Sequence, residues 1–152
     1  MSFRILVTGS SGFIGSAISS ALAAAGHNVR AASRTPGTVA HLDRVEWMKL
    51  PNLEDEVDWD PFVQGMDIVI HLAGIAHRSE SYRGDYDTIN RAVTIGLVKA
   101  CCRHDIKRLI FMSSIGAQTG SASEHMATEL DEPVPVNEYG RAKLGAEIEI
   151  QR

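Results

Sequence analysis

Three glycines near the N-terminus have a spacing that suits the binding of phosphate groups. Gly9, Gly12 and Gly15 lie between the apolar run 5–7 and a segment whose apolar residues recur at helical spacing. Glycine permits the positive φ angles of a tight turn and lets a ligand approach the backbone closely. The free N–H groups at the start of the following helix would attract an anion. The segment from Thr8 to Gly15 therefore predicts a phosphate-binding loop.

A second group of residues could transfer protons. Tyr139 and Lys143 are four residues apart in a predicted helix that begins near Asn137, so they share one helix face. A free tyrosine has a pKa of about 10. A neighbouring ammonium group stabilises the phenolate and lowers that pKa. The pair is therefore a candidate acid/base that works near neutral pH.

Alternating strands and helices would have to position both groups. Apolar runs predict strands at 5–7, 28–33, 45–50, 67–73 and 109–112, and helices at 14–25, about 85–104 and from 137 to the end, with a long loop over 115–135. This alternation predicts an α/β fold in three layers, with a parallel sheet covered by helices on both faces. Periodicity does not determine the order of the strands.

Length and composition narrow the class of protein. A chain of 152 residues predicts one domain. The net charge of −4 and the scattered basic residues argue against nucleic-acid binding. No stretch approaches the roughly 20 apolar residues of a membrane span, and the N-terminal apolar run is too short for a signal peptide. Two adjacent cysteines, Cys101 and Cys102, fit a reducing compartment, so we expect a cytoplasmic protein.

No metal site is expected. His71 and His77 are six residues apart, and no carboxylate lies at ligand spacing from them.

Five motifs follow one another along the chain: Thr8-Gly9-Ser10-Ser11-Gly12-Phe13-Ile14-Gly15, His71-Leu72-Ala73-Gly74, Asn90-Arg91-Ala92-Val93-Thr94, Ser113-Ser114 and Tyr139-Gly140-Arg141-Ala142-Lys143. Together these motifs resemble the extended short-chain dehydrogenase/reductase family, which includes NAD-dependent epimerases and dehydratases. Within that family the resemblance is strongest to UDP-sugar 4-epimerases. The resemblance implies a Rossmann-like doubly wound sheet.

The resemblance also implies roles for individual residues. Tyr139 would be the acid/base, Lys143 would hold the nicotinamide ribose and tune Tyr139, and Ser114 would hydrogen-bond the reacting oxygen. The implied cofactor-binding residues are Thr8, Gly9, Ser11, Gly12, Phe13, Ile14, Gly15, Ser33, Arg34, Asn52, Leu53, Leu72, Ala73, Gly74, Asn90, Tyr139 and Lys143.

Two positions depart from the family pattern. NAD-preferring members have an acidic residue after the second strand, where this chain has Ser33 and Arg34. These residues would accept the 2′-phosphate of NADP, so we expect NADP or NAD with NADP favoured. An acidic residue near the adenine is likewise replaced, by Asn52-Leu53.

Family enzymes have about as much chain again after the Tyr-x-x-x-Lys helix, and that part forms the substrate lobe. We therefore expect residues 1–152 to be a single NAD(P)-binding domain, truncated before the substrate lobe and inactive by itself. The resemblance also implies a homodimer through the helices near 85–104 and 137–152.

Three hypotheses for the function follow. The first is a sugar-nucleotide epimerase or dehydratase, and Ile115 and Gly116, where dehydratases carry acidic residues, favour an epimerase or simple reductase over a dehydratase. The second is an NADPH-dependent reductase of another small carbonyl substrate, which Ser33-Arg34 supports. The third is a non-enzymatic NAD(P)-sensing module on the same fold, which Tyr139 and Lys143 argue against.

Overall fold

Five apolar segments form one parallel sheet in the first of the two units into which the chain divides. The strands are β1 (Arg4–Thr8), β2 (Asn28–Ser33), β3 (Val45–Lys49), β4 (Ile68–His71) and β5 (Arg108–Phe111). Their order across the sheet is β3-β2-β1-β4-β5, and every neighbouring pair is parallel. The structure is a computed structural model that describes residues 1–76, 86–120 and 126–152. The predicted α/β class and parallel sheet are confirmed.

The first unit, Met1–Gly74 with Gly96–Met112, buries the middle of this sheet. Alternate side chains of β1 and β2, among them Ile5, Val7 and Val29, form a core with Ile70 of β4. Ile18 and Leu22 of helix α1 (Phe13–Ala24) pack against that core. Leu6 and Val69 point to the other face and are also fully buried. Both faces of the central strands are therefore covered, which explains their uninterrupted apolar sequences.

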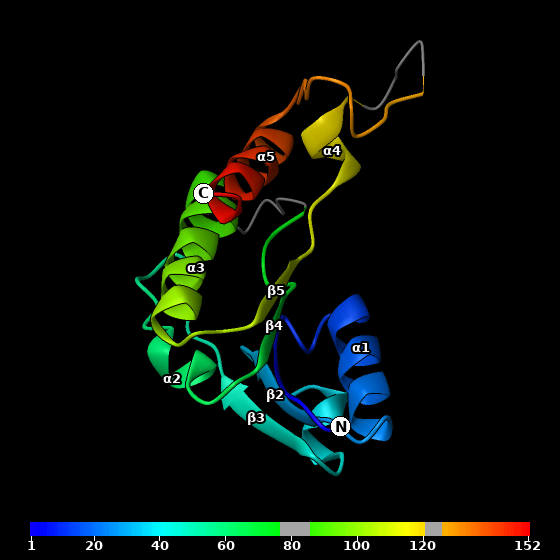
Figure 1. The fold of residues 1–152 in the computed structure, drawn as a ribbon, viewed down its shortest axis with the longest axis vertical. Helices are drawn as coiled ribbons and strands as arrows, with labels where there is room; N and C mark the ends of the chain where they lie inside the picture. Colours follow the sequence, from blue (N-terminus) through cyan, green and yellow to red (C-terminus); the bar gives the residue numbers. More distant parts are fainter. Residues whose placement is uncertain (77–85, 121–125) are drawn as a thin grey trace. The chain divides into compact units, whose positions relative to one another are not determined.

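Helices of the first unit lie on both sides of the sheet. Helix α1 lies on one side, and α2 (Asp60–Val63) with the part of α3 (Val93–Arg103) from Gly96 onward lies on the other (Figure 1). A short 3-10 helix, η1 (Thr38–His41), connects β2 to β3. This arrangement is the doubly wound, Rossmann-like fold.

The second unit, Ile75–Ile95 with Ser113–Arg152, is helical. Its elements are the π-helical segment η2 (Asp87–Ala92), the first turn of α3, the short helix α4 (Ile115–Gln118) and the long helix α5 (Glu138–Ile150). Helix α5 packs against both η2 and α4 (Figure 1).

Two of the predicted segments need correction in this second unit. The predicted loop 115–135 is wrong at its start, because Ser114 caps α4 by accepting a hydrogen bond from the N–H of Gly116. The predicted helix 85–104 begins with the π-helical η2 and continues as α3, and residue 85 lies outside the described residues. In the described ranges, no helix is long and apolar enough to cross a membrane.

Candidate functional site

The carboxyl ends of β1 and β4 mark the point where the strand order of the first unit reverses direction. From β1 the chain proceeds to β2 and β3 on one side, whereas β4 and β5 lie on the other side. Ligands of open α/β sheets bind in the crevice outside the carboxyl ends of the strands at such a reversal. The loop from Gly9 to Gly12 lies between β1 and α1, and therefore at that place.

The three glycines of this loop are required by its geometry. Gly9 has φ +71°, and a Cβ at this residue would lie 2.9 Å from the backbone nitrogen of Ala73. A Cβ at Gly15 would overlap the carbonyl group of Gly9, and one at Gly12 would lie 3.2 Å from that oxygen. The loop backbone therefore packs so closely against itself and against Ala73 that side chains do not fit at these three positions.

The start of α1 presents unpaired backbone groups. The first i→i−4 hydrogen bond of the helix runs from the N–H of Ser16 to the carbonyl of Gly12, so the preceding N–H groups have no partner within the helix. Phe13 and Ile14, which belong to this first turn, are 95% and 44% exposed. The phosphate-binding loop predicted from the glycine spacing therefore fits an anion at the helix N-terminus.

Thr8 joins the ends of β1 and β4. Its hydroxyl oxygen accepts hydrogen bonds from the N–H groups of Leu72 and Ala73, each at 3.1 Å. It also lies 2.7 Å from Nδ1 of the buried His71. The Thr8 hydroxyl and this ring nitrogen therefore share one hydrogen bond in addition to the two bonds from the backbone. Thr8 and His71 thus fix the strand ends beside Gly9.

Ser33, at the end of β2, is buried and fully hydrogen-bonded. Its Oγ accepts from the hydroxyl of Ser10 and from the indole N–H of Trp47, both at 3.1 Å. It donates to the carbonyl of Thr35 at 2.6 Å. These bonds assign Ser33 to the support of the loop that follows β2, whereas the neighbouring Arg34 is exposed.

The predicted adenine-side residues lie after β3. Asn52 is exposed, Leu53 is half-buried, and the amide of Asn52 donates to the carboxylate of Glu54 at 2.9 Å. The N–H of Leu50 donates to the carbonyl of Ser33. The segments after β2 and β3 are therefore joined at the same edge of the sheet.

In the second unit, Asn90 is almost completely buried and binds the backbone of Ile75. Its Oδ1 accepts from the Ile75 N–H at 2.9 Å, and its Nδ2 donates to the Ile75 carbonyl at 2.8 Å. Ile75 follows Gly74, the last residue of the predicted His71–Gly74 motif. Asn90 therefore fixes the chain immediately after that motif.

Ser114 and Tyr139 are brought to either side of Gly116. An added Cβ at Gly116 would lie 3.4 Å from Ser114 Oγ and 4.0 Å from Cδ1 of Tyr139. Helix α5 can approach α4 this closely because residue 140 is glycine, since a Cβ there would overlap the carbonyl of Gly116. Asn137 caps α5 by accepting from the Gly140 N–H at 2.8 Å. Capping and close packing thus set the position of Tyr139.

Lys143, one turn after Tyr139, is buried. Burial lowers the pKa of Lys143 to about 8, while the nearby carboxylate of Glu147 acts in the opposite direction. Glu147 also accepts a hydrogen bond from the hydroxyl of Ser113. The ring of Tyr139 meets that of Tyr86 edge-on, with centroids 5.7 Å apart.

Tyr86, Ser113 and Glu147 have contacts to the candidate site that sequence reasoning missed. Glu147 could have been found, because it follows Lys143 by the same four residues that separate Lys143 from Tyr139. Tyr86 gives no such signal in the sequence. Among the described residues no group of three or more His, Cys, Asp or Glu side chains could hold a metal ion, and His77 lies outside those residues.

An α/β fold of the Rossmann type is therefore present, with a glycine loop at its strand reversal and a Tyr-Lys pair on α5. Comparison with known proteins identifies the family. Residues 5–152 match the model of the NAD dependent epimerase/dehydratase family, and the chain belongs to that family.

Individual relatives are enzymes of more than one kind. The chain is 35% identical over 153 residues to the UDP-glucose 4-epimerase of Azospirillum brasilense and 32% identical over 142 residues to the dihydroflavonol 4-reductase of Arabidopsis thaliana. These alignments cover 95% and 84% of this chain but 42% and 36% of the relatives. The UDP-glucuronic acid 4-epimerase of Bacillus cereus in complex with NAD superposes with a TM-score of 0.83 and 25% identity, over 97% of this chain and 51% of the other. The chain thus spans between about a third and about half of these relatives' length.

Proposed function

We propose that this chain is the NAD(P)-binding part of a sugar-nucleotide epimerase or related oxidoreductase that acts through Ser114, Tyr139 and Lys143. The observation that carries the proposal is the arrangement of α4 and α5. Ser114 caps one helix, Tyr139 begins the other, and both lie beside Gly116. Lys143 is on the same helix as Tyr139, one turn further on, and is buried. Membership of the epimerase/dehydratase family supports this reading.

In the proposed reaction each of these residues has a separate task. The phenol oxygen of Tyr139 takes up or returns the proton of a substrate hydroxyl, and Lys143, four residues further along the same helix, would hold the nicotinamide ribose. The hydroxyl of Ser114 donates a hydrogen bond to the reacting oxygen. NAD or NADP, when bound, supplies the hydride transfer. The glycine loop and the first turn of α1 are the residues of this chain that would hold its pyrophosphate.

Arg34 is the residue through which we expect a preference for NADP. The hydroxyl of Ser33, on which the sequence prediction also relied, is already bound by Ser10, Trp47 and Thr35. The guanidinium of Arg34 is exposed and suits a 2′-phosphate. The solved relatives are described with NAD, so the choice between the two cofactors is open to direct measurement.

A reductase is the second candidate function. The relatives include a dihydroflavonol 4-reductase and a 2-alkyl-3-oxoalkanoate reductase, and the latter is 32% identical over 119 residues. Such an enzyme consumes NADPH, whereas an epimerase returns its hydride to the substrate. The two activities are separated by following the absorbance of NADPH during turnover of a UDP-sugar and of a small ketone.

The proposal is tested with the substitution Tyr139→Phe in the full-length protein. We expect the variant to bind NAD(P)H as the unmodified protein does, and to lose turnover by about a hundredfold or more because the acid/base is removed. Retained turnover would contradict the proposal. Loss of cofactor binding together with intact folding would assign Tyr139 to the cofactor site alone. Retained binding with no turnover of any substrate by the unmodified protein would favour the sensing module.

A further inference from the structure

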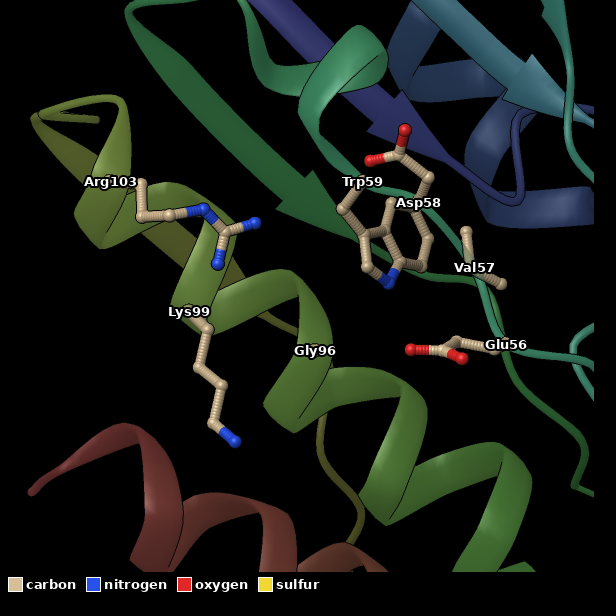
Figure 2. A pocket seen from close by; sticks show the side chains of 7 residues that line it. All are labelled: Glu56, Val57, Asp58, Trp59, Gly96, Lys99 and Arg103. Carbon is tan, nitrogen blue, oxygen red and sulfur yellow. The ribbon is translucent and has the colours of Figure 1, made fainter.

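A pocket of about 580 Å³ lies in the first unit, between the segment that precedes α2 and the face of α3. It is distinct from the glycine loop and from the proposed catalytic residues, none of which contributes to its lining. Its walls are formed by Glu56, Val57, Asp58 and Trp59 on one side and by Gly96, Lys99 and Arg103 on the other (Figure 2). The volume is within the range of small-molecule sites in proteins.

The indole N–H of Trp59 faces this pocket. The residue is 2% exposed, and its ring packs edge-on against Phe62 and His71, at centroid distances of 5.6 and 6.1 Å. In Figure 2 the indole nitrogen points into the space between Gly96 and Glu56. It has no hydrogen-bond partner among the described residues. The indole N–H is thus a donor that faces the pocket and is open to an acceptor that enters it.

The N–H is accessible because residue 96 carries no side chain. A Cβ at Gly96 would lie 3.3 Å from Cδ1 and 3.4 Å from Nε1 of Trp59. A longer side chain in that position would extend over the indole edge. A glycine inside a helix makes that helix less stable than an alanine would. Gly96 therefore destabilises α3 while it leaves the indole edge of Trp59 uncovered.

Charged residues of opposite sign line the two sides of the pocket. Arg103 is paired with Asp60 at 2.5 Å, and Asp58 accepts from the N–H of Asp60 at 3.1 Å. Lys99 and Glu56 have no ion pair or hydrogen bond in the part of the chain that the structure describes. Figure 2 shows Lys99 on α3 and the carboxylate of Glu56 turned toward α3 from the opposite segment.

We propose that this pocket binds a small zwitterion of the α-amino-acid class. Its carboxylate accepts the Trp59 N–H and lies near Lys99, and its ammonium group pairs with Glu56. The side chain of the ligand contacts Val57 and the indole edge. Glu56 would repel a simple anion and Lys99 a simple cation, so a ligand with both charges fits the pocket better than either.

Trp59 itself provides the measurement. The substitution Trp47→Phe leaves Trp59 as the sole tryptophan. This variant is titrated with L-leucine, with isocaproate, which lacks the ammonium group, and with isoamylamine, which lacks the carboxylate. We expect leucine to shift the emission of Trp59 and to bind about tenfold or more tightly than either partial molecule, which corresponds to one additional charged contact. If Trp47→Phe does not fold, the same titration follows the indole ¹H–¹⁵N resonances of the unmodified chain.

Variants of the pocket complete the test. Lys99→Met and Glu56→Gln are each expected to weaken leucine binding about tenfold, whereas Lys49→Met and Glu54→Gln, which lie outside the pocket, leave it unchanged. The proposal is overturned if leucine gives no change, if a partial molecule binds as tightly as leucine, or if the two control variants weaken binding as much as the pocket variants.

Discussion

The side-chain amide of Asn90 binds both backbone groups of Ile75, accepting from its N–H at 2.9 Å and donating to its carbonyl at 2.8 Å. A buried amide that is satisfied in this way fixes the chain after Gly74 in one conformation. These two hydrogen bonds are the structural reason for an asparagine at position 90. Asparagine matches a backbone N–H and a backbone carbonyl at once, which no carboxylate or aliphatic side chain does.

Replacing Asn90 by aspartate should therefore be costly although the shape is kept. The carboxylate still accepts from the Ile75 N–H, but it faces the Ile75 carbonyl without a proton to donate. We expect the free energy of unfolding to fall by about 2 kcal/mol. Urea denaturation of Asn90→Asp, compared with Asn28→Asp on the exposed start of β2, measures this. Equal stability of the two variants would show that the amide bonds contribute nothing.

The glycine loop should lose cofactor binding when Gly15 is replaced by alanine. The new Cβ overlaps the carbonyl of Gly9, so the loop must move before α1 can form its first turn. We expect NAD(P)H binding to weaken by tenfold or more, since about 1.4 kcal/mol of lost contact suffices. Gly26→Ala is the control, because a Cβ at Gly26 meets no atom within 4 Å and the strain there comes only from its positive φ. That variant should be less stable and yet bind the cofactor normally.

The burial of Lys143 predicts a dependence of stability on pH. Its pKa is about 8 in the folded chain and 10.5 in the unfolded chain, so between these values the unfolded state binds more protons. The free energy of unfolding should therefore rise with pH across this interval, by up to about 3 kcal/mol. Denaturation curves of the unmodified chain and of Lys143→Met, recorded at several pH values, give the free energy of unfolding of each protein. The expected rise is the change with pH in the difference between the two free energies. Parallel curves for the two proteins would contradict the burial of an ionisable amine.

Ser33 and Arg34 should have separable effects. Ser33→Ala leaves the indole N–H of Trp47 and the carbonyl of Thr35 without their partner, so we expect a loss of about 1–3 kcal/mol in stability. Its ratio of NADPH to NADH affinity should be unchanged. Arg34→Ala should leave stability unchanged and weaken NADPH binding selectively. A change of cofactor preference in Ser33→Ala would show that its hydroxyl is more accessible than its hydrogen bonds indicate.

The central strands β1 and β4 could be predicted from the sequence because they are apolar on both faces. Segments such as 5–7 are therefore recognisable without knowledge of their neighbours. Their order could not be predicted, because every strand of a buried parallel sheet has the same kind of pattern. The short helix α4 is not predictable from the sequence, because its four residues form a single turn and include Gly116.

The site was predictable where a local motif carries it, as at Gly9 or Tyr139. The partners of Ser33 and Asn90 could not be predicted, since Trp47 and Ile75 reach them only through tertiary packing. The pocket beside Trp59 was hidden for the same reason. Glu56 and Asp58 belong to a segment before α2, and nothing in the sequence places that segment opposite Gly96. The single domain over residues 1–152, the homodimer and the cytoplasmic location stay predictions.

Whether the glycine loop binds a nicotinamide dinucleotide is measured by a fluorescence titration of the purified chain with NADPH and NADH side by side. We expect saturable binding, with NADPH bound more tightly because of Arg34, and binding at least tenfold weaker in Gly15→Ala. A chain that is folded by circular dichroism and binds neither dinucleotide would contradict this expectation.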